Sequence, residues 1–162
     1  MAFILAPERD DDPEGASARY RAYLSQEKHH FPSGAFALAA SDWYLGFADH
    51  RAPHDAWLLS VSFDETGLGE RSEARGVSLC VRLLGAYHDL ELEFRYPRVF
   101  AYTIRGEVGN NGHRDWLYDE FRVSPQGHLL HEIQWWGSEQ TASWLIEADD
   151  VVFTSREVVR RT

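Results

Sequence analysis

The sequence predicts one mainly β domain of the α+β class, with about eight antiparallel strands after an N-terminal helix. A length of 162 residues suits a single domain with a sizeable core. Residues 13–54 carry helical or irregular signals, whereas residues 55–156 are β-rich and alternate between apolar and polar side chains. We expect the strands to pair in meander order and to form a curved sheet, a sandwich or a barrel.

The helical part begins at Asp12-Pro13, an N-cap residue followed by a proline that suits the first helical position. Tyr20, Tyr23 and Leu24 then follow a 3–4 spacing, and the helix should end before Pro32. Residues 1–12 form an acidic N-terminus that we treat as flexible, although the sequence leaves its order open. Residues 13–162 form the single domain.

The strands from residue 77 onward are predicted as hairpins. Gly85-Ala86 suits a type II′ turn, which places Val81 opposite Leu90 and all apolar residues on one face. A short connection at residues 96–98 then pairs the next strand with its predecessor, and Asp149-Asp150 forms the last hairpin turn. Because side chains alternate along a strand, a slip of one residue in any of these pairings would reverse its faces.

A further hairpin surrounds residues 124–127, which read as a type I turn followed by a glycine bulge. Its register pairs Trp116 with Trp136 and Phe121 with His131. Trp116 and Trp136 then lie on the opposite face from the neighbouring apolar residues, so both faces are aromatic there. An exposed patch of this kind marks an interaction site, including one for a homodimer.

Composition and charge limit the classes of function. The net charge is −10, which argues against nucleic-acid and anionic-membrane partners and suits a basic protein partner. The single cysteine, Cys80, excludes an internal disulfide. The apolar run at residues 1–6 is too short for a signal peptide or a spanning helix, so we expect a cytoplasmic protein. Lys28 is the only lysine among 16 basic residues, which favours a GC-rich bacterial source.

No metal or cofactor is expected. His128 and His131 are three residues apart, and side chains at that spacing point to opposite faces of a strand. Pro53 disrupts the helix that would bring His50 and His54 together, and no HExxH, phosphate-binding or nucleophile-elbow motif occurs.

Asp119 occupies a position where the alternation calls for an apolar residue, and the predicted register places it diagonal to His131. One interpretation is a catalytic acid/base pair in an aromatic cavity. The other, which we favour, is a buried polar pair whose members satisfy each other, because no nucleophile has a recognisable setting.

An acidic ridge is predicted on the outer face of the sheet, where Asp89, Glu91 and Glu93 project together. In the predicted register Arg82 and Arg105 flank Asp89, which leaves Glu91 and Glu93 to receive basic side chains of a partner. The same pattern also suits a solvated strand face that is guarded against aggregation.

His54-Asp55-Ala56 precedes an alternating strand, followed by the strand at residues 77–82 and the acidic–apolar strand at residues 89–95. This pattern resembles small bacterial predicted immunity proteins of polymorphic-toxin systems, over about residues 54–105. The resemblance implies neutralisation of a cognate toxin by binding, without catalysis or a cofactor. His54 and Asp55 therefore join the partner-binding candidates, although an aspartate at such a junction also bonds nearby backbone N–H groups.

The sequence thus favours a non-catalytic bacterial binding protein, in the form of an immunity-type inhibitor of a basic protein. Two alternatives stay open: a β-barrel or cavity protein that binds a small ligand, and an enzyme that uses Asp119 and His131.

Overall fold

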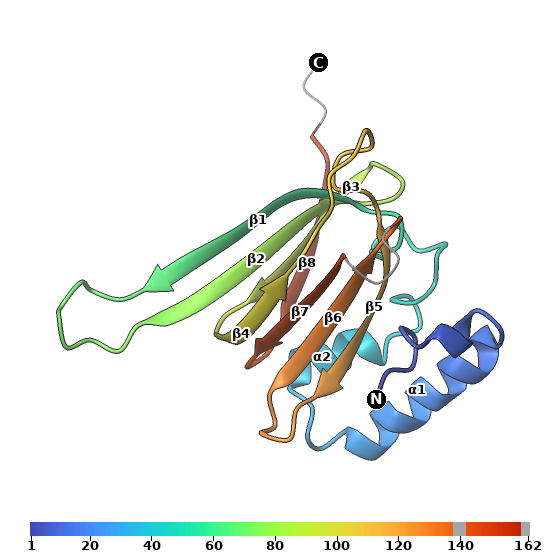
Figure 1. The fold of residues 1–162 in the computed structure, drawn as a ribbon, viewed down its shortest axis with the longest axis horizontal. Coiled ribbons are helices and arrows are strands. Elements are labelled where there is room, and N and C mark those ends of the chain that lie inside the picture. Colours follow the sequence, from blue (N-terminus) through green and yellow to red (C-terminus); the bar gives the residue numbers. More distant parts are fainter. Residues whose placement is uncertain (138–141, 160–162) are drawn as a thin grey trace.

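Two four-stranded antiparallel sheets pack face to face in the computed structural model, which describes residues 1–137 and 142–159 (Figure 1). The predicted mainly β fold with eight antiparallel strands and an N-terminal helix is confirmed, and the sheets do not close into a barrel. The first sheet has the order β1 (Trp57–Thr66), β2 (Gly76–Leu84), β3 (Leu90–Tyr96) and β8 (Val152–Glu157). The second has the order β4 (Val99–Ile104), β7 (Ser143–Ala148), β6 (Leu129–Trp135) and β5 (Trp116–Val123).

The strand order departs from a meander. Each sheet contains three strands that are consecutive in the chain, β1 to β3 in the first and β5 to β7 in the second. The fourth strand pairs with the last of these three, since β8 pairs with β3 and β4 pairs with β7. The predicted hairpins at residues 96–98 and at Asp149-Asp150 are therefore wrong, and both segments cross between the sheets. The crossovers hold each other: the Asp149 N–H donates to the Arg98 carbonyl (2.9 Å), and the Arg98 N–H donates to the Asp149 carboxylate (3.1 Å).

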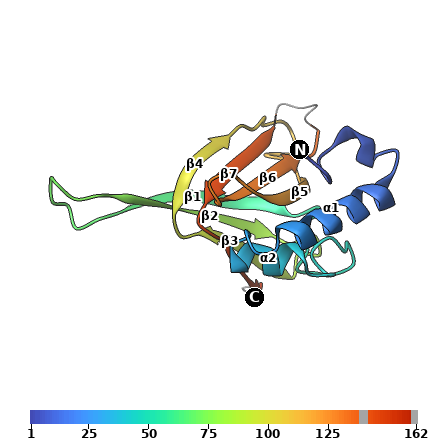
Figure 2. The same cartoon turned by 90° about the horizontal axis from the view of Figure 1, so that it is seen from below.

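Two helices close one side of the sandwich. Helix α1 (Pro13–Glu27) begins as predicted, because the Asp12 carboxylate accepts the Gly15 N–H at 2.9 Å. Helix α2 (Ser33–Ala39) packs against β5 and β8, and its first N–H groups donate to the carboxylate of Asp150. Figure 2 shows both helices away from the tip of the β1–β2 hairpin. No helix within the described ranges is long and apolar enough to span a membrane.

The outer edge of β5 is covered by α1. The Tyr20 hydroxyl donates to the Phe121 carbonyl and accepts the Phe121 N–H, both at 2.9 Å. The Tyr23 hydroxyl accepts the Val123 N–H at 2.9 Å. Burial raises the pKa of Tyr20 well above 10.0, so its hydroxyl keeps its proton. These bonds satisfy backbone groups that an edge strand otherwise leaves open to another chain.

The first residues also lie against β5. Glu120 is buried, and one oxygen of its carboxylate accepts the N–H groups of Phe3 (2.9 Å), Ile4 (2.8 Å) and Leu5 (3.3 Å). Its other oxygen accepts from Arg122 at 2.7 Å. The buried carboxylate thus has both an ion pair and backbone donors, as burial of a charge requires.

The β2–β3 hairpin forms, but its predicted register is wrong. Val81 lies opposite Phe94 instead of Leu90, because the loop is longer than two residues. The Gly85 N–H donates to the Leu90 carbonyl at 2.8 Å, and His88, not Gly85, takes the positive φ, at 59°. The shift preserves the parity of the pairing, so Val81 and Phe94 still face the core and are fully buried.

The β5–β6 hairpin keeps the predicted pairing of Phe121 with His131. An irregularity at Leu117 then shifts the register, so that Trp116 lies opposite Trp135 and not Trp136. Trp116 and Trp135 are buried between the sheets, whereas Trp136 is 47% exposed. The predicted aromatic pair of Trp116 and Trp136 is therefore wrong, and Trp116 belongs to the core.

The β1–β2 hairpin extends beyond the sandwich (Figures 1 and 2). We call its outer part, residues 60–80, the arm. Strand β1 pairs along its length with β2 alone, so its other edge is free from residue 59 to residue 66. Several apolar side chains near this edge are partly exposed: Leu59, Val61 and Phe63.

Candidate functional site

A buried polar network surrounds Asp119. His131 Nε2 lies 2.7 Å from the Asp119 carboxylate, as the diagonal placement predicted. The Tyr44 hydroxyl and the Trp116 indole N–H donate to the same carboxylate at 2.6 and 3.1 Å. Tyr96 completes the network, with its hydroxyl 2.6 Å from His131 Nδ1. A neutral His131 with its proton on Nε2 fits both of its contacts.

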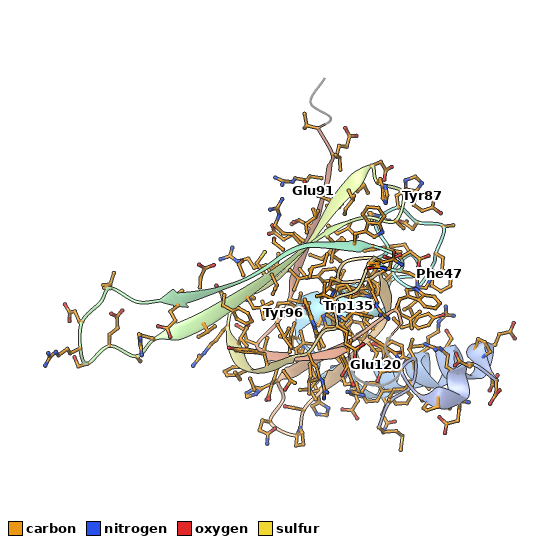
Figure 3. All side chains as sticks on the ribbon, turned by 45° about the horizontal axis from the view of Figure 1, so that its top comes forward. Phe47, Tyr87, Glu91, Tyr96, Glu120 and Trp135 are labelled. Atoms are coloured by element: carbon orange, nitrogen blue, oxygen red, sulfur yellow. The ribbon has the colours of Figure 1, made fainter. Side chains whose placement is uncertain are left out.

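This network is closed to solutes. His131 is 0% exposed and Asp119 is 3% exposed, so neither side chain can touch a substrate in this conformation. Burial, followed by the charge of Asp119, raises the pKa values of Tyr44 and Tyr96 well above 10.0, which keeps both hydroxyls protonated as donors. Figure 3 shows Tyr96 together with Trp135 inside the sandwich. The geometry is that of a polar core in which the bonds of each member are satisfied.

The predicted acidic ridge carries compensating cations. Glu91 accepts from Arg82 at 2.8 Å and from Arg156 Nε at 2.9 Å, and these bonds, led by that of Arg156, lower its pKa. Glu93 lies opposite Arg82 in the sheet. The expected flanking of Asp89 by Arg82 and Arg105 is wrong, since the four-residue shift of register brings Asp89 to His50 instead, at 2.6 Å. Glu91 points outward in Figure 3, on a face of mixed charge.

Two tryptophan–aspartate pairs lie at the end of the sandwich opposite the arm. The Trp136 indole N–H donates to Asp55 Oδ1 at 3.1 Å, and Trp57 lies beside Asp115, to which it is joined by an isolated backbone bridge. The backbone brings the pairs together, because Asp115 bridges Trp57 and its carbonyl accepts the Trp136 N–H at 2.8 Å. The Trp136 indole is thus held by its N–H, and the His88 ring lies 4.4 Å from that of Trp57. Both indoles remain half-exposed, at 49% for Trp57 and 47% for Trp136.

Two adjoining open pockets border these pairs. One, of about 580 Å³, is lined by Trp57 and Leu58, and the other, of about 430 Å³, is lined by Trp136. They share the lining residues Asn111, Arg114 and Asp115. We call Asp55, Trp57, Asp115 and Trp136, with these two pockets, the rim site.

The rim site is electronegative. It holds the carboxylates of Asp55 and Asp115 and one guanidinium, that of Arg114, which donates to the Gly137 carbonyl. Partial burial, followed by repulsion from Asp55, raises the pKa of Asp115 above 3.8. His54 Nε2 lies 3.5 Å from Asp55 Oδ2, so the basic groups beside these two carboxylates are Arg114 and His54.

Further aromatic and histidine side chains extend this surface. His54 stacks on Phe47 at 4.0 Å, and its Nδ1 lies 2.5 Å from the Leu117 carbonyl. The Tyr87 hydroxyl donates to the Phe47 carbonyl at 3.2 Å. Figure 3 shows Phe47 and Tyr87 at the same end of the molecule. The site is thus the centre of a larger half-exposed aromatic surface, which is the usual composition of a recognition patch.

The structure brings together three of the sequence-derived candidates at this end: His54, Asp55 and Trp136. It places Glu91 and Glu93 on the outer face of the first sheet, and Trp116 in the core. Trp57 and Asp115 were not among the sequence-derived candidates, because alternation alone does not show which side chains of a strand face solvent. An irregularity at Leu59 turns Trp57 outward. The signal in the sequence is the segment His54-Asp55-Ala56-Trp57, which places an aspartate and a tryptophan close together at the start of a strand.

The fold and this site define a β-sandwich with a half-exposed aromatic and acidic surface at one end. Comparison with protein-family models, with curated proteins and with solved structures found no match for the chain. Among residues 1–137 and 142–159, no three histidine, cysteine, aspartate or glutamate side chains are grouped as metal ligands.

Proposed function

We propose that the protein is a cytoplasmic, non-catalytic binding protein that captures an arginine or lysine side chain of a protein partner at the rim site. One observation carries the proposal: two half-exposed indoles, each beside an aspartate, border adjoining open pockets in a chain of net charge −10.

The chemistry of the rim site favours a cation. A guanidinium or ammonium group over an indole face gains about 0.5–2 kcal/mol, with the larger value when water is excluded. Asp55 and Asp115 can add charge-assisted hydrogen bonds to such a cation. The rim site has these two carboxylates but only one guanidinium of its own, that of Arg114. The acidic surface would also steer a basic partner toward the protein at low salt.

Binding without catalysis agrees with the placement of the reactive groups. Asp119 and His131 are buried and hydrogen-bonded. Burial raises the pKa of the Cys80 thiol, and the nearby Glu93 adds to this, so the thiolate that a nucleophile needs is disfavoured.

The biological form that we propose is an immunity-type inhibitor of a basic toxin in a bacterium. Its support is the resemblance of about residues 54–105 to predicted immunity proteins, since His54 and Asp55, which open that region, lie in or beside the rim site.

Calorimetric titration with a capped Arg-Gly-Arg-Gly-Arg peptide tests the proposal, with the Glu-Gly-Glu-Gly-Glu peptide as the control ligand. We expect the arginine peptide alone to bind, and we expect Trp136→Ala to weaken it about tenfold, in keeping with an indole–cation contact. Phe100→Ala is the matched control, because Phe100 is an aromatic residue 41% exposed on β4 that stacks on His128, outside the rim site. Equal binding by both variants, or no binding of the arginine peptide, would contradict the proposal.

A further inference from the structure

The outer edge of β1 runs from the rim site into the arm, and over residues 59–66 it pairs with no other strand of the described chain. The edge of β5 is covered by tyrosine hydroxyls of α1, whereas β1, which is an outer strand like β4 and β8, pairs only with β2 beyond its first residues. Of these outer strands, β1 is the one that begins in the rim site. An edge strand that is left open presents alternating N–H and C=O groups to any extended chain. Within β1 there is no proline or lysine to block such pairing.

This edge leads directly into the rim site. Asp115 occupies the outer side of β1 only at Trp57, through an isolated antiparallel bridge. The pocket of about 580 Å³ begins at that point, since Trp57 and Leu58 line it together with the segment from Asn111 to Asp115. A strand laid along residues 59–66 would therefore end in the pocket.

The side chains of β1 indicate which residue types would suit a neighbouring strand. Val61 and Phe63 lie on the face shared with the buried Val81 and Leu79, and Phe63 is 40% exposed although the Tyr102 ring packs on it at 4.5 Å. An apolar side chain on a neighbouring strand would complete that face. The other face carries Ser62 and Asp64, which suit a basic or polar neighbour.

We infer that the partner docks as an added β-strand along residues 59–66 of β1 and delivers its basic side chain to the rim site. The inference rests on the proposed function and specifies the form of the partner: an extended segment in which basic and apolar residues alternate. Main-chain hydrogen bonds hold such a segment, and the side chains on its two faces select it.

A second copy of the chain fits this edge poorly. Antiparallel self-pairing about Val61 would place Leu59 opposite Phe63, which is favourable. It would also place Glu65 of one copy opposite Trp57 of the other, next to Asp115 and Asp55. Like charges brought together across strands are destabilising, so the charges favour a basic strand over a second copy.

Backbone N-methylation of a peptide probe tests the inference. The probe is a capped octapeptide in which arginine and valine alternate, and it is compared with two isomers, one N-methylated at its four odd positions and the other at its four even positions. Only every second N–H of an added strand faces its neighbour. We expect one isomer to bind the full-length protein as tightly as the parent peptide and the other to bind at least tenfold more weakly.

Amide hydrogen exchange on the same samples locates the contact. With the parent peptide bound, alternate amides between Leu59 and Thr66 should exchange at least tenfold more slowly, while the amides of β5 should not change. Equal binding by the two isomers, or binding without protection of β1, would overturn the strand inference but leave cation capture at the rim site standing.

Two other results would also overturn the inference. If the arginine–valine peptide and the arginine–glycine peptide both fail to bind, the strand inference and the proposed function fall together. If the β1 amides become protected on raising the protein concentration without peptide, the occupant of the edge is a second copy of the chain.

Discussion

The protein holds three tryptophan–aspartate pairs, and their surroundings differ sharply. In the interior, the Trp116 indole donates to Asp119, whose carboxylate also accepts from Tyr44 and contacts His131. At the rim, the Trp136 indole donates to Asp55 and Trp57 lies beside Asp115, and both side chains are half-exposed. The same pair of side chains thus stabilises the core where its bonds are saturated, and offers a binding surface where they are not.

The largest effect should come from breaking the interior pair. Asp119→Ala leaves the Trp116 indole, the Tyr44 hydroxyl and His131 buried without their shared acceptor. We expect the free energy of unfolding to fall by about 3–5 kcal/mol, measured by urea denaturation. Asp55→Ala is the control at the rim and should cost less than about 1 kcal/mol, because water can replace the lost acceptor. Similar losses for the two variants would contradict the comparison.

Removing a rim indole should affect binding and leave folding nearly intact. We expect Trp57→Ala to weaken binding of the capped Arg-Gly-Arg-Gly-Arg peptide by about 1–2 kcal/mol and to change the free energy of unfolding by less than about 1 kcal/mol. Calorimetry and urea denaturation measure the two quantities. A variant that loses stability but keeps its affinity would place Trp57 among the structural residues.

The affinity for a cation should depend on pH through Asp115. Its pKa is raised above 3.8, so the carboxylate takes up a proton at a higher pH than an ordinary aspartate does. Because only the ionised form attracts the guanidinium, the affinity for the arginine peptide should fall, by up to about tenfold, as the pH is lowered through this raised pKa. Asp115→Asn should remove that part of the pH dependence, and an unchanged pH profile in this variant would exclude Asp115 as its source.

The smallest effect should be a gain in stability. A raised pKa means that folding disfavours the charged form of Asp115, so a neutral isostere should stabilise the fold at neutral pH. Since Asp115 is largely solvated, we expect Asp115→Asn to add only a few tenths of a kcal/mol. A rise in Tm together with weaker peptide binding would mark a residue kept for binding at the expense of stability. A lower Tm would contradict this account of the charge.

Local pattern was sufficient to predict the pairing of Phe121 with His131 and the contact of His131 with Asp119, because a two-residue period and a recognisable turn set that register. It was not sufficient near Leu59 and Leu117. One extra residue in each strand turned Trp57 outward and Trp116 inward.

The local sequence pattern could not predict the order of the strands in the sheets, for a different reason. Residues 96–98 and Asp149-Asp150 have the composition of hairpin turns, but they cross between the sheets. What holds them there is their contact with each other and the cap that Asp150 provides to α2. Contacts between segments about 50 residues apart leave no periodic signal in the sequence. The rim site depends on the same kind of contact, since Asp55, Asp115 and Trp136 come from three separate segments.

The most direct test of the central claim is the response of the six indole N–H signals in a nitrogen–proton NMR spectrum to the arginine peptide. We expect the signals of Trp57 and Trp136 to shift in a saturable manner, and those of Trp116 and Trp144, buried in the core, to stay in place. The Glu-Gly-Glu-Gly-Glu peptide should move none of them. Unchanged rim signals, or equal shifts with both peptides, would contradict the assignment of cation binding to the rim tryptophan–aspartate pairs.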